Sequence, residues 1–232
     1  MSDELVRWKR EAAEQAVRTV RDGMVIGLGT GSTSELAIQA LGERVQAGLQ
    51  IVGVPTSIRS EELAGSLGIP LADIQDVDRI DLTIDGADEI LPGTLTVLKG
   101  RGGALLREKL VAIASLREVI IADDTKLVEQ IGSRFPVPVE VVPFGWRLPR
   151  QQIEALGGKS VLRPAEDGQS PYITDNHNYI LDVDFGPIAD PAGLASQIKA
   201  IHGVVDHGLF IDLISEAIIC GSSGIQNLTR ER

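Results

Sequence analysis

Short apolar runs alternate with amphipathic stretches in the first half of the chain. Five runs have the length and composition of buried strands, at residues 24–28, 49–54, 82–84, 95–98 and 119–122. Four stretches carry apolar residues at helical spacing, at residues 2–20, 34–41, 60–67 and 104–116, the first with Ser2 as its expected N-cap. Strands that are apolar along their whole length are covered on both faces. This order therefore predicts an α/β fold, a mostly parallel, Rossmann-like sheet with helices on both faces.

A cluster of prolines marks a change of pattern. Pro136, Pro138, Pro143 and Pro149 fall within fourteen residues. The elements expected next are a strand at 137–142, a helix at 148–156, strands at 160–163 and 179–184, a helix at 191–201 and a strand at 204–206. This βαββαβ order is that of a smaller α+β ferredoxin-like domain. We expect residues 1–130 and 208–232 to form the larger domain, with the last apolar stretches rejoining its sheet, and residues 131–207 to form the smaller one.

The charge and composition of the chain narrow the range of partners. Asp and Glu number 33 against 22 Lys and Arg, so the formal net charge is −11, and aromatic residues make up 3%. A net negative charge repels a phosphate backbone, and few aromatic rings are present to stack on bases. We therefore expect no nucleic-acid partner. No apolar run approaches the roughly 18 residues of a membrane span, and the N-terminus lacks a secretory pattern, which predicts a cytoplasmic protein without a membrane partner. The single cysteine, Cys220, excludes an internal disulfide and a cysteine-based metal cage.

A glycine-rich segment, Gly29–Thr33, lies between a predicted strand and a predicted helix. Glycines let the backbone approach a ligand, and a helix N-terminus together with the hydroxyls of Thr30, Ser32 and Thr33 suits a phosphate. The segment lacks the lysine of a P-loop, and the next strand ends at Val54 without the carboxylate that a dinucleotide site needs. A phosphate site without a nucleotide is the better interpretation, with a merely structural turn as the alternative.

Charged segments follow the next strands. Asp85–Glu89 comes after the strand at 82–84, Lys99–Gly103 is a second glycine-rich loop with two cations, and Lys126 lies beyond the strand at 119–122. Ligands bind beyond the carboxyl ends of strands in open α/β sheets, so all three fall where a site is expected. The acidic segment could also be a solvated turn or, with a phosphate, a Mg²⁺ site. The three histidines lie far along the chain and are expected at surface or turn positions.

Glu108 stands on the helix that follows the basic loop. Its neighbours at helical spacing are all apolar: Ala104, Leu105, Val111 and Ala112. No cation on the helix therefore neutralises it. Such a carboxylate lies either on an exposed face of the helix or in a partly desolvated place, where burial would raise its pKa above the ordinary value, towards that of a general base at neutral pH. Lys109 also has only apolar neighbours at this spacing, so the surrounding motifs, and not the helix pattern alone, single out Glu108.

Together these segments resemble the type A ribose-5-phosphate isomerases. Each segment is unspecific by itself, but the combination is specific, and it covers nearly the whole chain in order. The matching segments are residues 27–33, 84–89, 99–105, 107–109, 121–126, 138–143, 174–176, 203–205 and 208–210.

The resemblance implies an aldose–ketose isomerase that interconverts D-ribose 5-phosphate and D-ribulose 5-phosphate through an enediolate, without metal or organic cofactor. It implies that Glu108 is the base that moves the proton between C2 and C1, that Asp85 assists ring opening, and that Lys99 stabilises charge on the substrate oxygen. It also implies a homodimer, or a tetramer, of the non-oxidative pentose phosphate pathway. The residues implied to hold the sugar phosphate are Thr30, Gly31, Ser32, Thr33, Asp85, Gly86, Ala87, Asp88, Lys99, Gly100, Arg101, Gly102 and Lys126.

Two residues depart from the common pattern of that family. Arg101 and His177 stand where many members have glycine. We expect Arg101 to point to solvent, and His177 to bear on a turn conformation or a subunit contact in the smaller domain. Two other functions stay open: a non-catalytic sugar-phosphate sensor, which would not need Glu108 or Lys99, and a coenzyme A transferase. The transferase would use a glutamate nucleophile but needs room for a nucleotide, usually in a longer or two-part chain.

Overall fold

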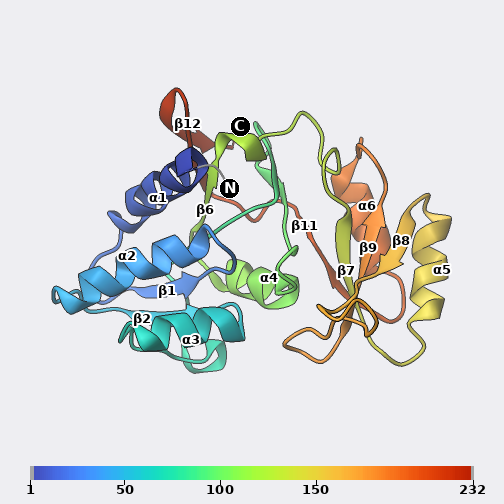
Figure 1. Cartoon of the computed structure of the whole chain (residues 1–232), viewed down its shortest axis with the longest axis horizontal. Helices are drawn as coiled ribbons and strands as arrows, with labels where there is room; N and C mark the ends of the chain where they lie inside the picture. The colour runs from blue at the N-terminus through green and yellow to red at the C-terminus, as the bar shows by residue number, and fades with distance from the viewer. Residues whose placement is uncertain (1–2, 231–232) are drawn as a thin grey trace.

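The computed structural model of the chain describes residues 3–230, and its largest element is a six-stranded sheet (Figure 1). The strand order is β13-β12-β6-β3-β1-β2, and every neighbouring pair is parallel except that of β12 with the edge strand β13. This arrangement confirms the mostly parallel sheet and the return of the last apolar stretches to it. The strands are β1 (Val25–Leu28), β2 (Val52–Pro55), β3 (Leu82–Asp85), β6 (Glu118–Asp123), β12 (Glu216–Gly221) and β13 (Gly224–Thr229).

Helices cover both faces of this sheet, as the sequence predicts. α1 (Asp3–Val17) and α2 (Ser34–Gln46) pack on one face, where their apolar side chains form one core with β1, β3, β6 and β12. α4 (Leu105–Ala114) packs on the opposite face, and α3 (Ile58–Ser66) lies beside α2 and β2. The predicted N-cap of the first helix, Ser2, lies outside the described residues. None of the helices in the described part of the chain is long and apolar enough to cross a membrane.

A small antiparallel sheet accompanies α4 on its face of the large sheet. It consists of β4 (Glu89–Leu91), β5 (Thr96–Leu98) and β11 (Leu209–Phe210), in the order β11-β5-β4. The apolar pattern did not predict β4, because this short strand begins with a charged residue. The buried Glu89 carboxylate accepts hydrogen bonds from three main-chain N–H groups of the segment 132–135, which explains how a carboxylate is tolerated there.

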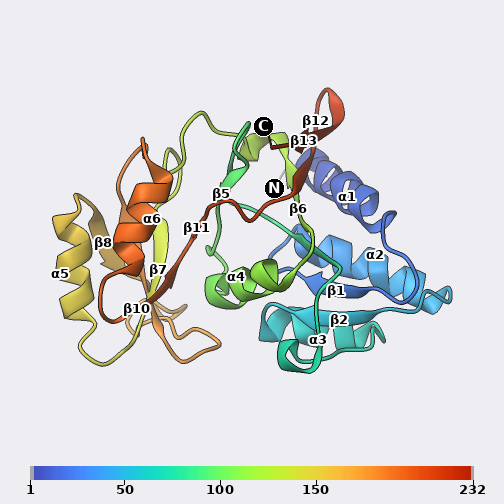
Figure 2. The same cartoon turned by 180° about the vertical axis from the view of Figure 1, so that it is seen from behind.

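The second half of the chain forms a four-stranded antiparallel sheet with two helices, called here the small unit (Figure 2). The strand order β10-β7-β9-β8 and the element order βαββαβ confirm the ferredoxin-like prediction. The predicted helix start is also right, because the Asp190 side chain accepts a hydrogen bond from the Gly193 N–H. Its elements are β7 (Val137–Val141), α5 (Arg147–Ala155), β8 (Lys159–Leu162), β9 (Tyr179–Asp184), α6 (Pro191–Lys199) and β10 (Val204–His207).

The helix that carries Glu108 lies between the two parts of the molecule. Figures 1 and 2 both show α4 between the six-stranded sheet and the small unit. Its residues contact β10 and β7 of the small unit as well as the core of the large sheet. The position of α4 is therefore set from two sides.

The turn at His177 places a residue other than glycine in a strained backbone conformation. The φ angle of His177 is 61°, in the left-handed region that favours glycine, and its side chain is exposed. We expect His177→Gly to stabilise the chain by about 0.5–1 kcal/mol, because relief of strain exceeds the entropy that glycine adds to the unfolded state. Thermal unfolding should show a rise in Tm of about 1–4 °C.

His202 supplies the matched control for this turn. It is also an exposed histidine in a turn, but its φ is not positive. His202→Gly should therefore lower Tm, because it only adds freedom to the unfolded chain. Equal shifts for the two variants would contradict the strain at His177.

Candidate active site

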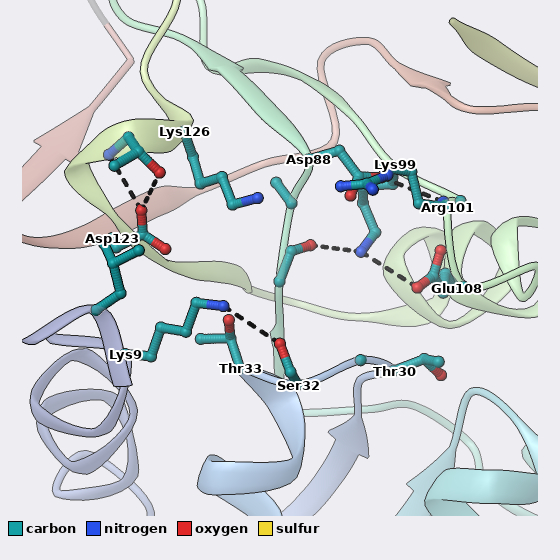
Figure 3. Close-up of a pocket in the computed structure, with 17 residues that line it drawn as sticks. Lys9, Thr30, Ser32, Thr33, Asp88, Lys99, Arg101, Glu108, Asp123 and Lys126 are labelled. Atoms are coloured by element: carbon teal, nitrogen blue, oxygen red, sulfur yellow. Dashed lines mark hydrogen bonds and ion pairs between the residues drawn. The ribbon is translucent and has the colours of Figure 1, made fainter. Parts of the chain in front are cut away.

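A cavity of about 470 Å³ lies beyond the carboxyl ends of β1, β3, β5 and β6 (Figure 3). Loops that are far apart in the sequence meet there, as expected for an open α/β sheet. It brings together Glu108 and every predicted substrate contact except Asp85. The predicted residues that line it are Thr30, Gly31, Ser32, Thr33, Gly86, Ala87, Asp88, Lys99, Gly100, Arg101, Gly102, Glu108 and Lys126.

Asp85 lies beneath the cavity and does not line it. Its side chain is 1% exposed, and its Oδ1 accepts hydrogen bonds from the Thr30 N–H, the Gly86 N–H and the Ser34 hydroxyl. The first loop approaches it so closely that a Cβ on Gly29 would lie 2.2 Å from Oδ1. Direct contact of Asp85 with a ligand is therefore not what this geometry favours, and the residue holds the loops together instead.

Lys99 joins Asp85 to Glu108. Its Nζ lies 2.9 Å from Asp85 Oδ2 and 3.4 Å from Glu108 Oε1, and it donates a hydrogen bond to the Gly86 carbonyl at 2.5 Å. Burial alone would lower the pKa of Lys99, but the two carboxylates outweigh it and raise the pKa above its usual value. The cavity wall therefore carries a permanent, desolvated positive charge.

Glu108 has the environment of a general base. Burial raises its pKa to about 8, against the opposing attraction of Lys99. Its Oε2 has no hydrogen-bond partner among the described residues, while Oε1 faces Lys99. A carboxyl group that titrates near neutral pH and keeps one oxygen unengaged can accept a proton from a bound molecule.

Cations gather at the other end of the cavity. Figure 3 shows Lys9 of α1 and Lys126 of η2 (Asp124–Lys126) pointing into it on the side away from Glu108. Lys9 Nζ donates a hydrogen bond to the Ser32 hydroxyl at 3.3 Å, and burial lowers the pKa of Lys126. The hydroxyl of Thr33 lies beside them in the figure. This end is suited to an anion even though the chain as a whole is acidic.

The hydroxyl of Thr30 does not belong to that group. It lies 2.7 Å from the Thr56 hydroxyl and 2.8 Å from that of Ser57, in a hydroxyl cluster behind the loop. The expectation that it serves a phosphate is therefore not supported, whereas Ser32 and Thr33 of the same loop lie at the cation-rich end.

Two expectations about charged residues need correction. Arg101 is exposed, as expected, but it lies on the rim of the cavity with its guanidinium 4.1 Å from the centre of the Phe135 ring, so it does not simply point to solvent. The expectation of surface or turn histidines is wrong for His207, which is buried at the end of β10 with Nδ1 3.4 Å from Lys109 Nζ.

Four lining residues were not singled out from the sequence: Leu5, Lys9, Asp123 and Thr125. Lys9 sits on an amphipathic helix, where a lysine normally marks the solvated face, and nothing local signals that it is 8% exposed. Asp123 ends a buried strand and caps η2 by accepting a hydrogen bond from the Thr125 N–H. Within residues 3–230, no group of three or more His, Cys, Asp or Glu side chains is arranged to hold a metal ion.

Known proteins place this arrangement in a family. The sequence model of ribose 5-phosphate isomerase A (phosphoriboisomerase A) matches residues 52–224. Ribose-5-phosphate isomerase A of Synechococcus sp. (strain JA-3-3Ab) is 56% identical over 228 residues, which are 98% of this chain and 97% of that protein. The chain belongs to the ribose 5-phosphate isomerase A family. The resemblance that the motifs indicated is thereby confirmed.

Solved structures of this family share the whole fold. Ribose 5-phosphate isomerase A of Methanocaldococcus jannaschii superposes with a TM-score of 0.93 at 39% identity, covering 97% of this chain and 99% of that one. A D-ribose-5-phosphate isomerase in complex with phospho-erythronic acid gives a TM-score of 0.94 at 38% identity, with the same coverage of the two chains. These family members therefore contain both the six-stranded sheet and the small unit.

Proposed function

We propose that the chain interconverts D-ribose 5-phosphate and D-ribulose 5-phosphate through an enediolate, with Glu108 as the base. The observation that carries this proposal is the buried pair of Glu108 and Lys99, 3.4 Å apart, in the wall of a cavity whose other end is lined by cations. A proton acceptor beside a fixed positive charge is what an α-hydroxy carbonyl isomerisation requires. A sensor would need neither Glu108 nor Lys99, and a coenzyme A transferase would need room for a nucleotide.

The reaction follows from these two groups. The Glu108 carboxylate takes the proton from C2 of the open-chain aldehyde, and the electrons of the C–H bond form the enediolate with its negative charge on O1. The Lys99 ammonium stabilises that charge. Protonated Glu108 then returns the proton to C1, while the O2 hydroxyl proton moves to O1 and leaves the ketone. Lys99 stays charged throughout, because its pKa is raised by the carboxylates around it.

Asp88 is the better candidate for opening the sugar ring. Unlike Asp85, it lines the cavity, and burial raises its pKa above the usual value although Lys99 and Arg101 oppose the shift. A carboxyl group with a raised pKa can give a proton to the ring oxygen and take one from the C1 hydroxyl. In this proposal Asp85 is a positioning residue that orients Lys99.

We assign the phosphate to the cation-rich end. Lys9 and Lys126 supply charge there, and the hydroxyls of Ser32 and Thr33 together with the N-terminus of α2 supply hydrogen-bond donors. Gly31, Gly86, Ala87, Gly100 and Gly102 also line the cavity, where their backbone groups are available to the sugar.

Inorganic phosphate is expected to stabilise the chain through this end. At ten times its Kd, phosphate adds about 1.4 kcal/mol to the free energy of unfolding, which raises Tm by about 3–5 °C. Lys126→Met should reduce this shift strongly. Lys159→Met, at an exposed lysine on β8, should leave it unchanged, and equal shifts in the two variants would contradict the assignment.

An assay with ribose 5-phosphate tests the function itself. The purified chain, treated with a chelator, should convert ribose 5-phosphate to ribulose 5-phosphate at an undiminished rate. Binding without conversion would favour the sensor, and activity that is lost with the chelator and restored by Mg²⁺ would favour a metal-dependent reaction.

We also propose that residues 1–130 with 208–232 form the catalytic domain and residues 131–207 the smaller domain of a cytoplasmic homodimer or tetramer. The separate sheets support the division. The exposed side chains of Phe144, Leu148 and Val161 on the small unit support a partner surface there. Light scattering of the purified chain tests the assembly, and a monomeric mass would contradict it.

A further inference from the structure

The two residues that flank Glu108 both tie α4 to the small unit. Lys109 Nζ donates hydrogen bonds to Asp206 Oδ1 at 2.6 Å and to the His207 carbonyl at 2.5 Å, both on β10. On the other side, Arg107 Nε donates to Asn176 Oδ1 at 3.0 Å. The helix segment that carries the base is thus held on both sides of Glu108 by groups outside the large sheet.

The hydrogen bonds of Lys109 are more deeply buried than the hydrogen bond of Arg107. Lys109, Asp206 and His207 are all buried, whereas the Arg107 side chain is 34% exposed. Burial lowers the pKa of Lys109 against the attraction of Asp206, and burial together with Lys109 lowers that of His207 to about 4. His207 is therefore neutral at pH 7. A desolvated ion pair adds little net stability but tolerates only one geometry, which is the property of a positioning contact.

The same segment of chain also holds Lys99. The Lys99 N–H donates to the Gly208 carbonyl at 2.9 Å, and a Cβ on Gly208 would lie 2.1 Å from the Lys99 carbonyl oxygen. The buried Phe210 ring contacts both ammonium groups, with its centre 4.9 Å from Lys109 Nζ and 5.6 Å from Lys99 Nζ. Residues 206–210 therefore fix Lys99 directly and Glu108 through Lys109.

We propose that Lys109, bonded to Asp206 and His207, is a positioning residue of the isomerisation, which fixes α4 so that the Glu108 carboxylate meets Lys99 and the substrate in the productive geometry. The inference rests on the proposed function and adds to it a role for the small unit. Misplacement of a reacting group by about 1 Å can cost roughly 100-fold in rate, so a contact outside the cavity can control turnover.

Lys109→Met tests this role, with Lys199→Met as its matched control. Lys199 Nζ lies 3.1 Å from the other oxygen of the same Asp206 carboxylate, but it belongs to α6, and its hydrogen bonds go to Val205 and Asp206 and not to α4. We expect Lys109→Met to lower kcat for ribose 5-phosphate by about 10- to 100-fold with KM within about threefold. Lys199→Met should leave kcat within about twofold. Equal kcat losses in the two variants would overturn the proposal.

The pH profile separates positioning from general destabilisation. The charged groups that act on Glu108 are Lys99, Lys109, Asp85, Asp88 and Glu118, and of these the two lysines lower its pKa. In Lys109→Met the acid limb of kcat/KM shifts to higher pH through the lost Lys109 charge and through any movement of Glu108 away from Lys99. Asp206→Asn keeps the lysine, so a shift of the limb in that variant reports the position of Glu108. An unchanged limb in a folded variant with reduced kcat would count against the proposal, and Lys199→Met should show no shift.

A milder variant covers the case in which Lys109→Met does not fold. Asp206→Asn keeps the shape of the side chain and weakens its bond to Lys109, so it should lower kcat by a smaller factor with the same upward shift of the acid limb. Unchanged kcat in folded Asp206→Asn would overturn the inference. Parent chain without isomerase activity would instead refute the proposed function, so the two failures are distinguishable.

Discussion

Glu108→Gln is expected to lower kcat by about 10³- to 10⁴-fold, because an amide cannot accept the C2 proton. Binding should survive, since the substitution keeps the size of the side chain and the phosphate end is untouched. Phospho-erythronic acid, the ligand in a solved family member, is a suitable probe of binding to both forms. Turnover within about tenfold of the parent would contradict the assignment of the base.

Glu118→Gln is the matched control for this substitution. Glu118 is as deeply buried as Glu108, and burial raises its pKa well above the usual value, but it does not line the cavity. Burial disfavours the charged form of Glu118, and a glutamine keeps the size and shape of its side chain. Glu118→Gln should leave kcat within about twofold, which separates loss of the base from loss of any buried carboxyl.

The pH dependence of the parent chain adds a second measurement of the same group. Glu108 must be ionised to accept a proton, and its pKa is raised to about 8. Activity should therefore rise with pH through an apparent pKa near 8 in kcat/KM, which reports the free enzyme. The residual activity of Glu108→Gln should lack this limb. A flat profile in the parent would contradict the raised pKa.

Hydrophobic periodicity predicted most of the fold because it is a local property. The six-stranded and the four-stranded sheet follow from runs and spacings that can be read within about fifteen residues. The exception, β4, depends instead on contacts that are distant in the sequence. The apolar pattern did not predict β4 because this strand begins with the charged residue Glu89. The Glu89 carboxylate is stabilised by main-chain N–H donors of the segment 132–135.

The sequence predicted which motifs form the site, but not how their side chains are arranged. The sequence could not decide whether Glu108 is buried, since the helix pattern gave the same answer for Lys109. Both are buried, and each finds its partner on another element: Lys99 for Glu108, and Asp206 for Lys109. The partner of Lys109 is 97 positions away, and a contact that distant leaves no periodic trace in the sequence, which also explains why the burial of His207 was not predicted.

Lys99→Met is expected to lower kcat by about 10²- to 10³-fold, because one preorganised charge that stabilises a developing oxyanion is worth that much. It should also shift the acid limb to higher pH, since Lys99 lowers the pKa of Glu108. The substitution leaves Asp85 buried without its counter-charge, which costs about 3–5 kcal/mol of stability. Folding is therefore to be checked by circular dichroism before rates are compared.

Lys126→Met distinguishes a lysine that binds the substrate from one that stabilises the charge formed during the reaction. Lys126 lies at the cation-rich end, so its loss should raise KM for ribose 5-phosphate while kcat falls much less than in Lys99→Met. If Lys99 only bound the ground state, both variants would raise KM and spare kcat. A folded Lys99→Met chain with parental kcat and an unmoved acid limb would remove Lys99 from the reaction, and with it the reason for the buried pair.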